Sequence, residues 1–199
     1  LFAACKKDSI DPFDAGYGIK AKLNGEYVEL ENVSPGNAND CTFQSFCEAS
    51  IDSPCTLIYS SRILSNTEGW SITISYKTTA DKASLQDDGQ NWVHQTFDGI
   101  TALDIGSLPF AENGGFGVSI DATNLSTNER YATQNYPWGT IAADNRFSFR
   151  FTKGAVSTTN NYVQTYSPTY QLMARGEFSA MLYSNSGDSL IISEADFQL

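Results

Sequence analysis

Few side chains in this sequence have the types and spacing that catalysis requires. His94 is the only histidine, so a serine-based triad would have to use it as its base. The Gly-x-Ser string Gly117-Val118-Ser119-Ile120-Asp121 lacks a closing glycine and alternates like a strand, whereas an activated serine needs a sharp turn from strand to helix. We therefore expect Ser119 to be an outward hydroxyl and His94 to be a surface or hydrogen-bonded histidine.

Carboxylates are plentiful, but their spacing matches no known catalytic or metal site. Glycoside hydrolysis needs two carboxylates held apart in a cleft, and Glu29 and Glu31 instead share one face of a predicted strand. The best calcium candidate, Asp87-Asp88-Gly89-Gln90-Asn91, lacks the alternating ligands and the distal glutamate of a calcium loop. The sequence therefore predicts a protein that is not an enzyme and has no cofactor, with a structural calcium at this loop as the alternative.

Cys5 stands in a context that suits covalent modification of its thiol. Apolar Leu1-Phe2 and small Ala3-Ala4 precede it, and polar Lys6-Lys7 follows. This pattern resembles the end of a bacterial lipoprotein signal peptide, although Phe2 stands where leucine is commonest. The resemblance implies that residues 1–4 are the remnant of the signal and that Cys5 carries a diacylglyceryl group. Two or three acyl chains give stable attachment to a bilayer.

Residues 5–16 are polar, contain Pro12 and show no periodic apolar pattern, so we expect a flexible leash. Twelve residues extend to at most roughly 40 Å, which would lift the body just clear of the headgroups. No segment approaches the roughly 18 consecutive apolar residues of a spanning helix. The expected organisation is a leash followed by one domain over residues 17–199, anchored at the outer membrane, with the periplasmic or outward face left open.

Three further cysteines, Cys41, Cys47 and Cys55, lie in an exported context where disulfides persist. A short helix over 40–49, capped by Asp40, would place Cys41 and Cys47 about 240° apart, so that they could not bond each other. This favours a bridge from Cys55 to Cys47, with Cys41 as the alternative partner. The spacing matches no familiar zinc pattern, so we expect no metal there.

The bulk composition indicates a soluble all-β domain. Basic residues number 12 against 23 acidic ones, giving a net charge of −11, which argues against nucleic acid as a partner because phosphates need clustered Lys and Arg. Aromatics make up 13% of the chain, and long helical patterns are few. About 180 residues suffice for one domain with a core.

Alternating apolar residues predict the strands. Asn24-Gly25 predicts the turn of a first hairpin, with return over 27–33, and further strands are expected over 56–63, 69–77 and 116–120. Phe147, Phe149 and Phe151 should share one face in the core, and residues 170–192 should form a long hairpin turning at 185–188. These elements predict an antiparallel two-sheet sandwich or jelly roll, with one short helix near the cysteines.

Four large aromatics fall in segments that read as loops. Trp92, Tyr131, Tyr136 and Trp138 are the candidate ligand-binding residues, since sugars stack on such rings while Asn and Gln supply hydrogen bonds. The last three lie in a predicted long loop over 124–139. The alternative is that these rings fold back and cap the core.

Segments near both ends resemble a protein family. The sequence is similar to uncharacterised β-sandwich lipoproteins of Bacteroidetes-type bacteria in two places. These are residues 19–26 near the start, and residues 176–180 with Ser186-Gly187-Asp188 near the end. The resemblance implies a cell-envelope location and brings no catalytic residues. We therefore expect a non-enzymatic binding or accessory subunit of an outer-membrane or surface assembly, with a protein partner or a glycan as ligand. The alternatives are a glycan-binding module that uses the loop aromatics and a fibre subunit joined by strand addition.

Overall fold

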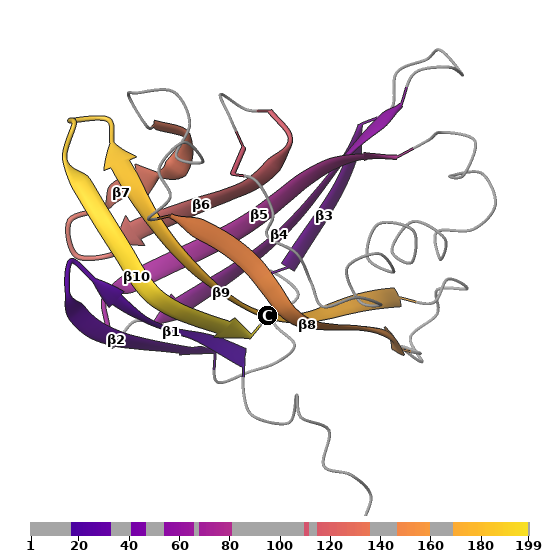
Figure 1. Ribbon diagram of the computed structural model, residues 1–199, viewed down its shortest axis with the longest axis horizontal. Coiled ribbons are helices and arrows are strands. Elements are labelled where there is room, and N and C mark those ends of the chain that lie inside the picture. Colours follow the sequence, from indigo (N-terminus) through magenta and orange to yellow (C-terminus); the bar gives the residue numbers. More distant parts are fainter. Residues whose placement is uncertain are drawn as a thin grey trace, which may run out of the picture.

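The computed structural model describes residues 17–32, 41–46, 54–65, 68–80, 110–111, 115–135, 147–159 and 169–198 (Figure 1). Within them the chain forms antiparallel strands and one turn of 3-10 helix, which confirms the predicted all-β class. The strands are β1 (Tyr17–Leu23), β2 (Glu26–Asn32), β3 (Cys41–Phe46), β4 (Cys55–Ser65), β5 (Trp70–Ala80), β6 (Gly117–Asn124), β7 (Glu129–Ala132), β8 (Ser148–Thr159), β9 (Thr169–Ser184) and β10 (Ser189–Gln198). The 3-10 helix η2 spans Thr133–Asn135. In this part of the chain no helix has the length and hydropathy needed to cross a bilayer.

The described strands belong to one sheet that curls on itself. Its order is β2-β1-β10-β9-β7-β6-β5-β4-β3, and β2 lies against β4 across the core. Strand β9 is long enough to have two neighbours on one side, because Tyr183 and Ser184 pair with β7 while residues 169–179 pair with β8. The strands thus follow one hydrogen-bonded path, and the predicted division into the two sheets of a sandwich or jelly roll is not confirmed.

The core lies inside the curl. Phe149 is fully buried, and its ring stacks on Phe197 at 5.3 Å and on Phe178 at 6.0 Å between centroids. A bulge between Ile192 and Ala195, with Glu194 at a φ of 52°, shifts the alternation of β10 so that both Ala195 and Phe197 point inward. Inward residues of the other strands complete this core; the largest of them are Ile19, Leu30, Leu57, Ile63, Ile72, Ile120, Leu182 and Ile192.

Four tight turns lie together at one end of the sheet, on the left in Figure 1, which we call the turn end. They are the turns at 24–25, 68–69, 125–128 and 185–188, and they belong to the hairpins β1–β2, β4–β5, β6–β7 and β9–β10. The predicted Asn24-Gly25 turn is confirmed, since both residues have positive φ, of 49° and 90°. Asn24 also joins β10, because its N–H donates to Ile191 O and its Oδ1 accepts from Ile191 N, both at 2.8 Å.

Two sequence predictions of local structure are wrong. The short helix expected over 40–49 is not formed, because residues 41–46 make strand β3, which pairs with β4 from Cys41↔Ser61 to Phe46↔Thr56. Cross-strand pairing has overridden the capping signal of Asp40. A long loop was also expected over 124–139, but its first part forms a tight turn at 125–128 followed by strand β7. Asn124 Oδ1 accepts from the N–H groups of Ser126 and Thr127, and the chain returns as β7.

Phe116 does not follow the alternation of the strand that it precedes. The alternation with Val118 and Ile120 predicts an inward ring, but Phe116 is 55% exposed while its two partners are buried. Gly117 has a φ of 120°, a conformation that side-chain-bearing residues rarely adopt, and the backbone there turns Phe116 out of the alternation. A glycine at the start of a strand has therefore placed a large aromatic ring in solvent.

Candidate functional site

The outward side chains of β4, β5 and β6 form a surface that we call the polar face. Inward residues such as Ile63, Ile72 and Ile120 are buried, so by alternation their neighbours point to solvent. Its polar residues, which define the polar face, are Ser60, Arg62, Thr73, Ser75, Lys77, Ser119 and Asp121, joined by Arg130 of β7. The half-buried Ile58 and Leu64 of β4 share the same outward parity. All of these side chains are at least partly exposed.

Strand register arranges these residues in rows across the sheet. Ser60 is opposite Ser75, and Ser75 is opposite Ser119, so three hydroxyls lie on adjacent strands. Two residues along, Arg62 is opposite Thr73, which is opposite Asp121. Neighbouring strands are spaced about 4.8 Å apart, and rows two residues apart lie about 7 Å from each other. The polar face is therefore a regular array of hydrogen-bonding groups.

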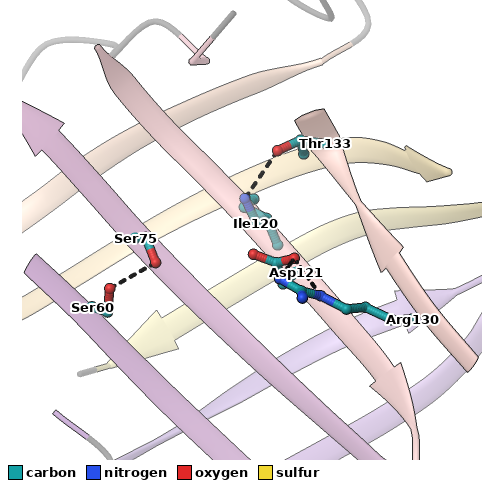
Figure 2. A network of polar contacts seen from close by, with 6 residues as sticks. All are labelled: Ser60, Ser75, Ile120, Asp121, Arg130 and Thr133. Atoms are coloured by element: carbon teal, nitrogen blue, oxygen red, sulfur yellow. Dashed lines mark hydrogen bonds and ion pairs between the residues drawn. The ribbon is translucent and has the colours of Figure 1, made fainter. Parts of the chain in front are cut away.

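Contacts within the polar face hold its side chains in place (Figure 2). Ser60 Oγ and Ser75 Oγ share a hydrogen bond of 2.8 Å. The guanidinium of Arg130 donates to Asp121 Oδ1 from Nε at 3.0 Å and from Nη2 at 2.6 Å. In the same strand as Asp121, the backbone N–H of Ile120 donates to the buried Thr133 Oγ1 at 3.0 Å, which ties η2 to β6.

Arg62 is held differently from Arg130. Its Nε donates to Ser71 Oγ at 2.8 Å, and Ser71 is almost fully buried. Within the described residues no carboxylate contacts Arg62, and its side chain is exposed. The guanidinium therefore has donors still available to a ligand.

Phe116 and Lys77 lie together at one border of the polar face. Lys77 is opposite Gly117, and its Nζ lies 5.6 Å from the centroid of the Phe116 ring, a cation–π contact. Since the ring is 55% exposed, it offers an aromatic surface beside the hydroxyl row.

A second cluster lies at the turn end around Tyr131. The Tyr131 hydroxyl donates to Glu129 Oε2 at 2.9 Å, and its ring packs against Trp70 with 6.2 Å between centroids. Burial raises the pKa of Tyr131, and the hydrogen bond and negative charge of Glu129, together with the charge of Asp188, raise it further. Both rings are half-buried and pack against the core.

Ser186 links the carboxylates of this cluster. Its Oγ lies 3.1 Å from Glu129 Oε1, 2.9 Å from Asp188 Oδ2 and 2.7 Å from Ser184 Oγ. Because a hydroxyl has one proton, Ser186 donates to one carboxylate at a time. No group of three or more His, Cys, Asp or Glu that could hold a metal ion occurs among the described side chains.

The turn end is acidic, while the rest of the described surface is largely neutralised. Each of its four turns has a carboxylate beside it or within it: Glu26, Glu68, Glu129 and Asp188. None of these carboxylates contacts a basic side chain in the described part of the chain. Cross-strand ion pairs instead run over the outer side of β2, β1, β10, β9 and β8: Lys20–Glu29, Lys22–Glu194, Arg175–Asp196 and Arg150–Glu177.

The pairing of β3 with β4 excludes one of the two disulfide bridges that the sequence left open for Cys55. Cys55 is disulfide-bonded, and its partner lies outside what the structure describes. Cys41 is opposite Ser61, six residues along β4 from Cys55, which corresponds to about 20 Å. A disulfide holds its Cα atoms roughly 4.4–6.8 Å apart, so the Cys41–Cys55 alternative is incompatible with this register. The Cys47–Cys55 bridge stays a prediction, because Cys47 lies outside the described residues.

Most of the residues singled out from the sequence lie outside the described residues. These are Cys5, Cys47, Trp92, His94, Tyr136, Trp138 and the calcium candidate at 87–91. Tyr131 is the one candidate aromatic that is described, and it lies on a strand instead of a loop. Whether the four aromatics gather at one site therefore stays a prediction.

Comparison of the chain with protein-family models, with curated proteins and with solved structures finds no match.

The sequence did not point to Arg62, Lys77 or Phe116 as a group. They come from three strands, and only the register brings them to one surface. The available signals were the hydroxyl-rich outward positions of 56–63 and 69–77 and the glycine that follows Phe116.

Proposed function

We propose that the protein is a lipid-anchored cell-envelope protein, attached at the outer membrane through Cys5, which acts as a non-enzymatic binding or accessory subunit. The observation that carries this proposal is the sequence Ala3-Ala4-Cys5 followed by a polar leash. A thiol in this setting suits a diacylglyceryl group, and the body that follows offers binding surfaces built on a rigid sheet.

The topology of the sheet supports such an arrangement. Gly18, near the start of β1, is opposite Gln198, near the end of β10, so both ends of the described domain lie side by side. That position is opposite the turn end, because β1 runs from Tyr17 toward the Asn24-Gly25 turn. A leash entering at residue 17 would therefore hold the domain with its turn end away from the bilayer.

Charge favours the same orientation. The four turn-end carboxylates, which contact no basic side chain among the described residues, would be repelled by anionic headgroups within about one Debye length, roughly 8 Å at physiological salt. The turn end would then be the part of the domain that meets a partner in the assembly.

Replacing the anchoring thiol tests this function. We expect the wild-type protein in the membrane fraction of its native cells and the Cys5→Ser variant in the soluble fraction, because loss of the acyl chains removes about 0.8 kcal/mol per methylene. Cys41→Ser is the matched control and should stay with the membrane. Retention of Cys5→Ser in the membrane fraction would contradict the anchor, and affinity isolation of the anchored form without a stoichiometric partner would contradict the subunit role.

Strand addition into a fibre is a second candidate function, supported by the sheet edges. Strand β2 is one end of the path and carries Glu26 and Glu29, charges that discourage pairing with another chain. Strand β3 is the other end, and its sequence Cys41–Phe46 has no charged residue and no proline. Strand β8, which pairs with β9 alone among the described strands, carries Arg150 and Lys153. Addition of a strand would therefore occur at β3, and a chain that stays monomeric at high concentration in sedimentation would rule it out.

A further inference from the structure

The turn between β1 and β2 carries an asparagine directly before a glycine, a pair with chemistry of its own. The backbone nitrogen that follows an asparagine can attack the amide carbon of that side chain, and glycine leaves the approach open because it has no Cβ. Asn24 and Gly25 are both exposed to water. Apart from its chain neighbours, no heavy atom lies within 4 Å of the position that a Cβ on Gly25 would take. The pair is therefore sterically open to this reaction.

The reaction needs no reactant other than water. The Gly25 nitrogen gives up its proton and bonds to Asn24 Cγ, the bond from Cγ to Nδ2 breaks, and ammonia leaves with that proton. Water then adds to one of the two carbonyl carbons of the resulting cyclic imide and opens the ring. The product is aspartate or, when the chain now runs through the side-chain carbon, isoaspartate.

The structure holds Asn24 away from this reaction through two hydrogen bonds to β10. Asn24 N–H donates to Ile191 O, and Ile191 N–H donates to Asn24 Oδ1, both at 2.8 Å. The side-chain carbonyl is thereby fixed on the neighbouring strand. Attack needs the carboxamide to be free to rotate over the Gly25 nitrogen, so Asn24 must first separate from Ile191.

We infer that Asn24 is a site of covalent self-modification, which deamidates when the first turn separates from β10 and is protected by the Ile191 bonds while the two are joined. Each hydrogen bond should slow the reaction by about two- to tenfold, and both together by roughly four- to hundredfold. The inference goes beyond the proposed function and does not depend on the lipid anchor.

Asn24 differs in this respect from the asparagines in the other turns. Asn128 and Asn185 precede Glu129 and Ser186, whose side chains hinder attack by the following nitrogen. The two products at Asn24 also differ in effect. Aspartate keeps an oxygen that accepts from Ile191 N–H, whereas isoaspartate adds a backbone atom to a turn whose geometry depends on its length. Isoaspartate should therefore release the turn from β10.

Peptide mapping of the full chain after incubation in mildly alkaline buffer tests the inference, because mass spectrometry detects the exchange of nitrogen for oxygen and chromatography separates isoaspartate from aspartate. We expect Asn24 to react at least about fourfold more slowly in buffer than in urea. In urea, Asn113, the other asparagine that precedes a glycine, should react as fast as Asn24. Hydrogen exchange should protect the Ile191 N–H by the same factor, since one opening controls both reactions.

Variants separate the hydrogen bond from other causes of slow reaction. Asn24→Ala removes the acceptor and should lower the protection of Ile191 N–H by about two- to tenfold, whereas Asn24→Asp should keep it. Asn128→Gly, at a positive φ in the β6–β7 turn, is the matched control and should leave it unchanged. The inference is overturned if Asn24 reacts as fast in buffer as in urea, if it forms no product in urea, or if Asn24→Ala and Asn128→Gly protect Ile191 equally.

Discussion

At the scale of single residues, two glycines and one tyrosine determine how nearby aromatic rings are placed. Gly117 turns Phe116 into solvent, and Gly176 allows the Phe197 ring to lie over the backbone of β9, where a Cβ would overlap that ring and the Arg150 carbonyl oxygen. Tyr131 is held by Glu129 at the turn end. The contacts of Tyr131 and Gly176 each lead to a prediction that can be measured.

The ionisation of Tyr131 should depend on Glu129. Since burial and the nearby negative charges raise the pKa of Tyr131, the neutral phenol is favoured in the folded state. Its contribution to the free energy of unfolding is full below the usual tyrosine pKa of about 10 and is lost as pH rises through the raised value. In an NMR titration of ring-labelled tyrosine, assigned with Tyr131→Phe, Glu129→Gln should lower this pKa. Glu26→Gln should not, and an unchanged midpoint in Glu129→Gln would argue against the coupling.

Gly176→Ala should destabilise the fold. Its Cβ would meet the Arg150 carbonyl oxygen and the Phe197 ring, and overpacking of this kind costs about 1–3 kcal/mol. Urea unfolding measures the change. Ser189→Ala, at an exposed position of β10, is the control and should stay within about 0.5 kcal/mol of wild type. Equal stability of the two variants would mean that the ring does not lie over Gly176.

At the scale of elements, hairpins with their own turn signals could be predicted and the pairing between distant strands could not. Asn24-Gly25 and residues 185–188 predict their hairpins because turn chemistry and alternation are local. Strand β3 was missed because Cys41–Phe46 fits a capped helix about as well as a strand, and only its pairing with β4 decides. The polar face depends on the register of β4, β5 and β6, which a single sequence does not encode locally.

The β3–β4 register predicts the disulfide. With Cys41 about 20 Å from Cys55, we expect a Cys47–Cys55 bridge and a free thiol at Cys41. Peptide mapping after alkylation without reduction should find Cys41 alkylated and residues 47 and 55 linked. Cys47→Ser should cost about 2–3 kcal/mol of unfolding free energy because the bridge closes a short loop, whereas Cys41→Ser should cost less than this. A linked peptide that contains Cys41 would show that the register differs in solution.

At the scale of the whole molecule, three regions of the surface have distinct charge. The turn end is acidic, the outer side of β2, β1, β10, β9 and β8 carries cross-strand ion pairs, and on the polar face Arg130 pairs with Asp121. The composition predicted only the net charge of −11 and the exclusion of nucleic acid. The distribution follows from the fold, because the sheet brings the four turns together at the end opposite Tyr17.

The most direct test of the account is the intact mass of the protein purified from its native envelope. We expect a mature chain that starts at Cys5 and carries a diacylglyceryl group on the sulfur, with a mass that drops by the ester-linked acyl chains after alkaline hydrolysis. A chain that still has Leu1–Ala4 attached, with an unmodified thiol at Cys5, would contradict it.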